Sequence, residues 1–491
     1  MKRQRAIGQS LSLMALLALF LLHSMLAVIA DQVAAAGQLG RLSPGGLSRV
    51  KHAAIVPATG HYYVSLTGDD GHPGTEELPW RTLQHAVDSV GPGDTIIVQA
   101  GVYAGARIER SGTAAAPITL QAALGEKVLL NTPGPANAHN SILEVETWEG
   151  DGTVAHWVIQ GFEMAHAPRY GIDIRHTRHV VVRGNHVHDS GLTGIFTAFS
   201  DDVLVEDNES DHNGEHGIYH SNSGDRPTLW GNVLHHNSGC GIHMNGDASM
   251  GGDGIISHGL VEANVIYENG ASGGSGINMD GVTHTLVRNN VLYDNHASGI
   301  SLYRIDGAVC SSNNQVLNNT ILMASNGRWA LNIPDPGCIN NRIFNNVLYS
   351  AHAWRGSILI ANPALAGFTS DFNVVMDRFS ADGGGSRIGL AGWQALGYDA
   401  HSFIATPDQL FVDLAANDYH LQTDSPAIDA GGNDEAANTD FDGDPRPVDG
   451  DGDGLAVVDI GADEVVAGAS GASTWYVRPD GGSTAQCTGL V

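Results

Sequence analysis

A short phrase that recurs between residues 171 and 333 presents chemically versatile side chains at two fixed positions. Its copies read GIDIR, GIFTA, GIYHS, GIHMN, GINMD, GISLY and, more weakly, ALNIP, so polar and apolar residues alternate. That period of two is typical of a strand with one set of side chains inside and the other outside. The outward residues are Asp173, Phe196, Tyr219, His243, Asn278, Ser301 and Asn332 in one column, and Arg175, Ala198, Ser221, Asn245, Asp280 and Tyr303 in the second. Such side chains bind sugars by stacking and by directional hydrogen bonds, although outward residues that are merely solvated are the alternative.

Two insertions indicate that the binding site lies on the middle copies of the phrase. The distance from the repeat glycine to a recurring asparagine is 14 to 16 residues in five copies, but 23 after Gly241 and 20 after Gly299. Both insertions, around residues 247–257 and 304–314, leave the same corner, and insertions on one face of a repeat protein usually wall its binding site. We therefore place a concave site on residues 217–307. Its expected substrate-binding residues are Tyr219, Asn222, Asn245, Asn278, Asp306 and Asn332.

Acidic residues near this corner are candidates for binding Ca²⁺, the one cofactor that we predict. Asp225, Asp247 and Asp253 offer the hard oxygen ligands that calcium prefers. Separately, the run DGDGDG places Asp449, Asp451 and Asp453 at alternate positions. It resembles a calcium loop, but its twelfth position is Ile460 rather than the glutamate of an EF-hand, and a simple acidic turn is the alternative.

The spacing of the phrase indicates the elements that position these residues. Its glycines are Gly171, Gly194, Gly217, Gly241, Gly276 and Gly299, and three of the five steps are 23 residues long. A period of this length is the signature of a solenoid. We expect Ile172, Ile195, Ile218, Ile242, Ile277 and Ile300 to stack inside parallel strands, and Asn185, Asn208, Asn232, Asn264, Asn290, Asn319 and Asn346 to form a ladder at one turn. His220 takes an inward position, which favours a hydrogen-bonded core histidine over a catalytic one.

These features resemble the pectin-lyase-like superfamily, which implies an all-β fold, a right-handed single-stranded parallel β-helix, over residues 60–425. The segment from Tyr62 to Tyr103 resembles the N-terminal capping unit of bacterial members, with a helix over residues 82–90 that covers the open end of the stack. The motifs SPAIDAG, DFDGDPRP and DIGADE resemble the acidic C-terminal module of secreted members, which we place at residues 426–466. Residues 467–491 resemble the start of a second β-helix, as in a truncated chain or a vestigial repeat.

The resemblance implies a polysaccharide lyase or another uronan-modifying enzyme, such as an epimerase, that acts on an acidic glycan. β-Elimination needs a base beside the uronate carboxylate, a positive charge to neutralise that carboxylate, and often an acid for the leaving oxygen. We take His243, Asp280, Tyr303 and Arg304 as catalytic candidates, with Asp247 and Asp280 available to hold calcium. Many lyases of this fold use a lysine, however, and none of Lys2, Lys51 and Lys127 lies in the central repeats.

Two other functions stay open. A glycoside hydrolase needs two carboxyl groups about 5 to 9.5 Å apart, which Asp225, Asp247, Asp280 and Asp306 could supply from neighbouring coils. A non-catalytic secreted module for glycan binding, adhesion or surface architecture is the third reading, because this kind of fold hosts many functions. The tetrapeptide NMDG at Asn278 resembles a polygalacturonase motif only superficially, since its companion motifs are missing.

Composition and targeting signals bound the partners and the location. The chain has 24 Lys and Arg against 53 Asp and Glu, a formal charge of −29, which excludes nucleic acid and anionic membranes as partners. The same charge would repel the acidic polysaccharide that the resemblance implies unless bound cations or a local basic patch reverse its sign, so a divalent metal is the natural companion of that partner. Basic residues followed by an apolar run predict a signal peptide at residues 1–36 and a secreted or cell-surface protein, with an uncleaved N-terminal anchor as the alternative. We expect a monomer. In an oxidising location, Cys310 and Cys338 should lie at similar heights on successive coils and form a disulfide.

Overall fold

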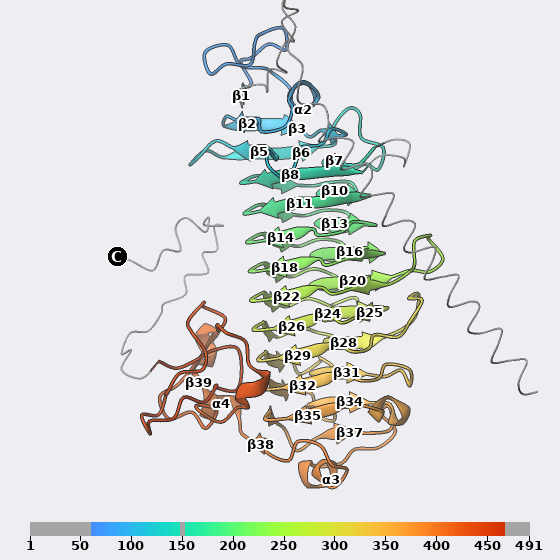
Figure 1. Cartoon of the computed structure of the whole chain (residues 1–491), viewed down its shortest axis with the longest axis vertical. Coiled ribbons are helices and arrows are strands. Elements are labelled where there is room, and N and C mark those ends of the chain that lie inside the picture. Colours follow the sequence, from blue (N-terminus) through green and yellow to red (C-terminus); the bar gives the residue numbers. More distant parts are fainter. Residues whose placement is uncertain (1–59, 148–152, 467–491) are drawn as a thin grey trace, which may run out of the picture. The chain divides into compact units, whose positions relative to one another are not determined.

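The computed structural model describes residues 60–147 and 153–466 of the chain, and these residues form one parallel β-helix with an appended C-terminal segment (Figure 1). The predicted signal peptide, residues 1–36, and the predicted tail, residues 467–491, lie outside the described residues. Each coil contributes one strand to each of three long sheets, which we call A, B and C. The strands within each of these sheets are parallel, so the predicted fold class is confirmed.

The strand bounds follow the order of the coils. Sheet A contains β1 (His61–Val64), β2 (Thr95–Val98), β5 (Ile118–Ala122), β8 (Val154–Gln160), β11 (Thr177–Arg183), β14 (Leu204–Glu206), β18 (Thr228–Trp230), β22 (Leu260–Glu262), β26 (Leu286–Arg288), β29 (Gln315–Leu317), β32 (Arg342–Phe344) and β35 (Thr369–Asp371). Sheet B contains β3 (Gly101–Ala104), β6 (Val128–Thr132), β9 (Glu163–Ala165), β12 (His186–His188), β15 (Glu209–Asp211), β19 (Val233–His235), β23 (Val265–Tyr267), β27 (Val291–Tyr293), β30 (Thr320–Met323), β33 (Val347–Ser350), β36 (Val374–Val375) and β38 (Phe403–Ile404). Sheet C contains β4 (Arg107–Ile108), β7 (Leu143–Val145), β10 (Ile172–Arg175), β13 (Ile195–Ala198), β16 (Ile218–Asn222), β20 (Ile242–Gly246), β24 (Ser275–Asp280), β28 (Ser298–Tyr303), β31 (Leu331–Ile333), β34 (Ile358–Ile360) and β37 (Phe379–Ser380).

The remaining elements are short. A small parallel sheet joins β17 (Gly224–Asp225), β21 (Ile256–Ser257) and β25 (Val282–Thr283), and β39 (Phe411–Asp413) pairs antiparallel with β40 (Asp418–Leu421). The α-helices are α2 (Leu83–Ser89), α3 (Leu390–Gln394) and α4 (Pro407–Leu410), and 3₁₀ turns span Asn362–Leu365, Leu414–Ala416 and Asn433–Glu435. None of the helices in the described residues has the length and apolar character needed to cross a bilayer.

The interior of the helix is a stack of aliphatic side chains. The strand register pairs Ile172 with Ile195, Ile195 with Ile218, and so on through Ile242 and Ile277 to Ile300, and all six are fully buried. Because a parallel register repeats the same position on every coil, the predicted Ile stack is confirmed. His220 lies in the neighbouring inward column, in register with Thr197 and Met244. Its Nδ1 lies 2.6 Å from Thr197 Oγ1, which confirms the hydrogen-bonded core histidine.

Asparagines close the turn between sheets A and B. Asn232 shows the pattern, because its Nδ2 donates to Asn264 Oδ1 on the next coil at 3.0 Å and to the Val205 carbonyl at 2.9 Å. The predicted ladder is confirmed from Asn185 to Asn346, and it continues to Asn373. The sequence analysis missed a second ladder between sheets B and C, formed by Asn213, Asn237, Asn269 and Asn295.

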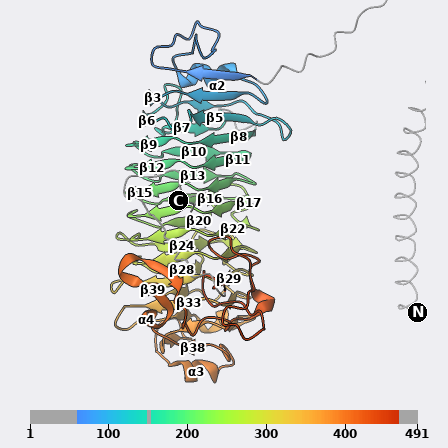
Figure 2. The same cartoon turned by 90° about the vertical axis from the view of Figure 1, so that its left-hand side faces the viewer.

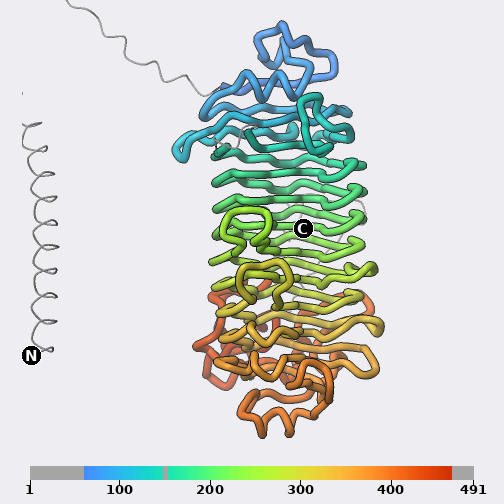
Figure 3. The backbone as a smooth tube through the Cα atoms, turned by 90° about the vertical axis from the view of Figure 1, so that its right-hand side faces the viewer, coloured from blue at the N-terminus to red at the C-terminus, as the bar shows by residue number. Residues whose placement is uncertain are grey.

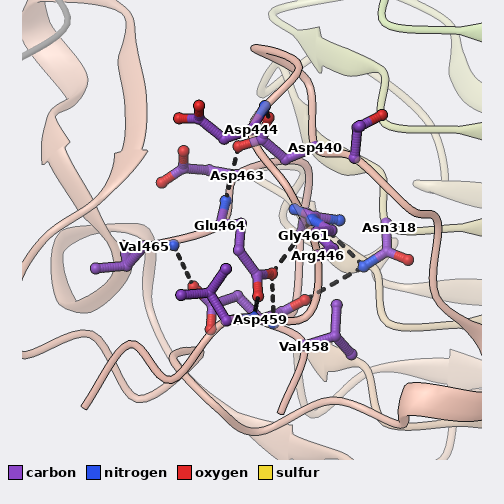
Figure 4. A network of polar contacts seen from close by, with 12 residues as sticks. Asn318, Asp440, Asp444, Arg446, Val458, Asp459, Gly461, Asp463, Glu464 and Val465 are labelled. Carbon is purple, nitrogen blue, oxygen red and sulfur yellow. Dashed lines mark hydrogen bonds and ion pairs between the residues drawn. The ribbon is translucent and has the colours of Figure 1, made fainter. Parts of the chain in front are cut away.

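Two further features complete the molecule. Helix α2 begins after Thr82, whose hydroxyl accepts a hydrogen bond from the His85 amide, and it buries Leu83, Ala86 and Val87 in the core at the N-terminal end of the stack. After β38 the chain turns back and packs beside sheet B, coloured red in Figures 1 and 2. Arg446 anchors this segment to the β-helix with a hydrogen bond to Asn289 Oδ1. Within the segment Arg446 also donates to the Gly461 carbonyl (Figure 4).

Candidate functional site on the outer face of sheet C

The two predicted columns lie on the outer face of sheet C. The register pairs Asp173, Phe196, Tyr219, His243, Asn278, Ser301 and Asn332 in one line. It pairs Arg175, Ala198, Ser221, Asn245, Asp280 and Tyr303 in the other. These side chains are less exposed than solvated residues would be, because most of the two columns is buried or half-buried.

The two insertions meet beside this face. The Ala248 amide donates to the Asp306 carbonyl at 3.1 Å, and the Ala308 amide donates to the Gly254 carbonyl at 3.0 Å. Figure 3 shows the two loops, yellow-green and yellow, next to one another on one side of the β-helix. Cys310 and Cys338 form the predicted disulfide, with a Cα–Cα distance of 4.8 Å, and this bond ties the second insertion to the following coil.

Aromatic rings line the middle of the first column. Tyr170 stacks on Phe196 with ring centroids 4.5 Å apart, Phe196 meets Tyr219 edge to face, and Tyr219 stacks on His243 at 4.6 Å. The Arg175 guanidinium lies 4.7 Å from the centroid of the Phe196 ring. Tyr170 and Phe196 are 7% and 5% exposed, so these two rings pack mainly against one another, whereas Tyr219 is half-buried.

The predicted catalytic residues lie in different environments. Asn278 donates to the Tyr303 hydroxyl oxygen at 2.6 Å, so the Tyr303 proton stays available for another acceptor. Burial raises the pKa of Tyr303 well above its usual value, so this phenol stays protonated at neutral pH. The backbone amide of Arg304 donates to Asp335, and the Arg304 side chain is exposed. Burial, with His216 beside it, holds the pKa of His243 far below its usual value, so this imidazole is neutral.

Asp280 differs most from the expectation of an outward, solvent-facing carboxylate. It is 0% exposed, and its two oxygens accept hydrogen bonds from the amides of Ile305, Asp306 and Gly307. Burial raises its pKa, while these three amides act in the opposite direction. Three accepted hydrogen bonds use most of the lone pairs of a carboxylate, so Asp280 is built to fix the second insertion and does not fit a calcium ligand.

The other predicted contacts are spread along the same face. Asn245 donates to the Tyr219 hydroxyl at 3.3 Å, and Asn332 donates to Ser301 Oγ at 3.2 Å. Asn222 ends β16 in the left-handed conformation, with φ at 69°, and accepts from the Ser221 hydroxyl. Asp306 is exposed in the second insertion.

The acidic residues predicted to bind cations make hydrogen bonds within their own loops. Asp225 Oδ1 accepts from the Ser257 amide and hydroxyl, whereas Asp247 and Asp253 each use only Oδ1 among the described residues. In the exposed DGDGDG loop, Asp449 accepts from the amides of Gly452 and Gly454, and Asp451 and Asp453 each accept from the amide two residues on. Calcium at either place stays a prediction.

The sequence analysis missed a charged cluster at the N-terminal end of the same face. Arg107, Glu144 and Asp173 extend the first column upward. Arg107, which is 1% exposed, donates to Glu144 at 3.0 Å, and Arg175 donates to Asp173 at 2.8 Å. Burial raises the pKa of Asp173, against the opposing effect of Arg175. The coils that carry β4 and β7 lack the Gly-Ile phrase, so no repeat signal marked these residues.

A shallow pocket described by the structure lies away from this face. Phe344, Phe372, Asn433 and Glu435 line it, where the C-terminal segment meets sheet A. The concavity of the predicted surface on residues 217–307 stays a prediction.

An all-parallel β-helix with this repeated asparagine ladder defines the class: the protein is a right-handed single-stranded parallel β-helix. More narrowly, residues 62–330, over half of the chain, match the family described as "Pel9A-like, right handed beta helix region", and the chain belongs to that family. A pectate lyase PEL9 of Emericella nidulans is 33% identical over 163 residues, which cover 29% of this chain and 38% of the relative. The uncharacterized protein YwoF of Bacillus subtilis is 26% identical over 215 residues, 40% of this chain and 46% of the relative. The chain thus spans less than half the length of these curated relatives.

Among solved structures, a pectate lyase Pel9A superposes with a TM-score of 0.55 at 16% identity, over 83% of this chain and 97% of the other. At that identity the likeness shows the fold.

Proposed function

We propose that the protein is a secreted polysaccharide lyase, or a related uronan-modifying enzyme, that binds an acidic glycan along the outer face of sheet C. The observation that carries the proposal is the in-register strip of aromatic and amide side chains, flanked by the two hydrogen-bonded insertions and with arginine at both ends. Membership of the Pel9A-like family and the named activity of the fungal relative support the same chemistry.

In this proposal Tyr303 and Arg304 carry the chemistry of the central coils. Tyr303 keeps its proton and points to the role of general acid for the leaving oxygen. The exposed Arg304 side chain neutralises the uronate carboxylate, which makes the adjacent C–H more acidic. Neutral His243 is the proposed base, and its Nδ1 would accept the proton after its contact with His216 opens. Lys127, the lysine within the described residues, is exposed and lies beside Glu163 on sheet B.

Calcium would supply a second positive charge at the substrate carboxylate. Asp247 and Asp253 fit it best, because each keeps Oδ2 without a hydrogen bond among the described residues and both lie on the first insertion. A polysaccharide is the proposed partner, and the protein is proposed to act as a monomer outside the cell.

The deciding experiment is a substrate screen of the purified full chain on alginate, pectate, chondroitin and neutral glycans, with calcium or with EDTA. A lyase gives ultraviolet absorbance from the new C=C bond together with new reducing ends. Reducing ends without that absorbance would instead mean a glycoside hydrolase, and binding without turnover would mean a non-catalytic module. Arg304→Ala should lower kcat/KM about 100-fold or more, whereas Arg178→Ala, an exposed arginine on sheet A, should leave it unchanged.

A further inference from the structure

Two histidines and a cysteine gather at one edge of sheet C. His243 is an outward residue of β20, His216 precedes Gly217 one coil earlier, and Cys240 lies just before β20. One ligand atom from each of the three side chains lies within 4.8 Å of the other two. Cys240 is a buried free thiol, and its sulfur accepts a hydrogen bond from the Ser275 amide.

The hydrogen bonds among these groups fix where the protons lie. The Cys240 amide donates to His216 Nδ1 at 2.9 Å, so the proton of neutral His216 is on Nε2. That Nε2 lies 3.1 Å from His243 Nδ1, which leaves the proton of His243 on its own Nε2. His243 Nε2 is buried and has no hydrogen-bond partner in the described part of the chain.

We propose that His216, Cys240 and His243 form a binding site for Zn²⁺ or another borderline-soft transition-metal ion. The donor set of two imidazole nitrogens and one sulfur suits such ions and does not suit calcium. With metal–nitrogen bonds of about 2.0 to 2.1 Å, a tetrahedral ion separates its two nitrogens by about 3.3 Å. The present 3.1 Å between His216 Nε2 and His243 Nδ1 needs only a small opening. When the metal takes the lone pair of His216 Nε2, the proton of that imidazole moves to Nδ1, and the hydrogen bond from the Cys240 amide to Nδ1 breaks.

Sulfur fits the same arrangement. A metal–sulfur bond of about 2.3 Å places sulfur about 3.6 Å from each nitrogen. The three ligand atoms lie within 4.8 Å of one another, so at most a small movement is needed. Binding breaks the S–H bond and releases that proton to solvent, because the thiolate is the ligand. Three protein ligands leave a fourth position for water or for an oxygen of a molecule on the face of sheet C.

Other clusters of histidine and acidic residues could also bind a metal ion, so the test must detect the sulfur of the proposed site. On sheet B, His186, Glu209 and Asp211 form one group, and Asp211, His212 and His235 form another, with similar spacing. Both groups can adsorb metal ions, but neither contains sulfur. A signal that requires a metal–thiolate bond therefore separates the proposed site from them.

The test is a titration of Co²⁺ into the chelator-treated full chain, read by the thiolate-to-cobalt charge-transfer band in the near ultraviolet. We expect one equivalent of Co²⁺ to develop the band, Zn²⁺ to abolish it, and Cys240→Ser to eliminate it while circular dichroism stays native. His243→Ala should weaken Co²⁺ binding at least about tenfold. His235→Ala on sheet B and Cys487→Ser, the remaining cysteine, should leave the band unchanged.

Absence of the band in the wild-type chain, or its persistence in Cys240→Ser, would overturn the proposal. Cys240→Ala provides a second sulfur-free variant should the serine hydroxyl disturb folding. The readout does not involve any glycan, so this proposal and the proposed function can fail separately.

Discussion

At the scale of single residues, the most informative side chain is Asp280, because a position that faces outward in the pattern is saturated with hydrogen bonds. Its carboxylate holds three consecutive amides of the second insertion. Its role is therefore to position Tyr303, Arg304 and Asp306 rather than to meet the reacting atoms.

Asp280→Ala should lower the free energy of unfolding by about 2 to 3 kcal/mol, because three buried amides lose their acceptor. Urea denaturation measures this change. The exposed Asp306→Ala on the same loop serves as the control and should cost less than about 0.5 kcal/mol. An Asp280→Ala protein as stable as wild type would show that water or the loop itself satisfies these amides.

Tyr303→Phe tests the proposed acid at the same scale. Removing the hydroxyl should lower kcat about 100-fold with little change in KM, since the proton is transferred only in the transition state. Asn278 loses an acceptor in this variant, so Asn278→Ala is measured beside it. A larger loss of kcat in Asn278→Ala than in Tyr303→Phe would contradict the assignment.

At the scale of elements, the disulfide between Cys310 and Cys338 connects the second insertion to the coil of β31. A loop of 28 residues closed in the unfolded chain corresponds to roughly 3.5 kcal/mol of stabilisation. The free energy of unfolding of the Cys310→Ser, Cys338→Ser double variant, measured by urea denaturation, should therefore be lower by that amount. Dithiothreitol should lower the urea midpoint of the wild type only. Equal shifts of both proteins by dithiothreitol would argue against this bond as the cause.

More of the strands and of the contacts between coils could be predicted from the sequence than of the contacts within the candidate site. Three patterns in the sequence each predict a contact between neighbouring coils: the Gly-Ile phrase, the ladder through Asn232 and the spacing of the cysteines. Because the strands are parallel and in register, the first two contacts recur along the stack. Asp280 shows the limit, because its partners are backbone amides whose direction depends on how the insertion folds. Arg107 and Glu144 show another, since their contact joins coils that carry no recognisable repeat.

At the scale of the whole molecule, the C-terminal segment is attached through buried charges. Burial raises the pKa of Asp459 to about 8 and that of Glu464 to about 7, in both cases against the opposing effect of Arg446. His420 is buried too, but the Asp442 and Asp463 carboxylates outweigh burial and raise its pKa to about 9. Figure 4 shows Asp459, Glu464 and Arg446 in contact where the segment meets Asn318 of the β-helix.

These raised pKa values predict that acid stabilises the attachment. The folded state holds protons that the unfolded chain has released, so the stabilisation is complete below about pH 4 for the carboxyl groups and below about pH 6.5 for His420, and it is lost as pH rises toward 8 or 9. Unfolding midpoints should fall between pH 5 and pH 8.5. Asp459→Asn should flatten that slope, and an unchanged slope would assign the dependence to other groups.

The repeated register also makes one coil an exchangeable unit. Residues 195–217 contain β13, β14 and β15 and span one period, so their deletion would join Gly194 to Ile218 with every sheet still in phase. The ladder would then connect Asn185 directly to Asn232, and Tyr219 would stand beside Asp173. A shortened chain that refolds cooperatively, with undiminished circular dichroism per residue, would show that this protein can be lengthened or shortened in whole periods. Adding or deleting a coil would then lengthen or shorten the face of sheet C, and with it the number of sugar units that the proposed binding face could contact.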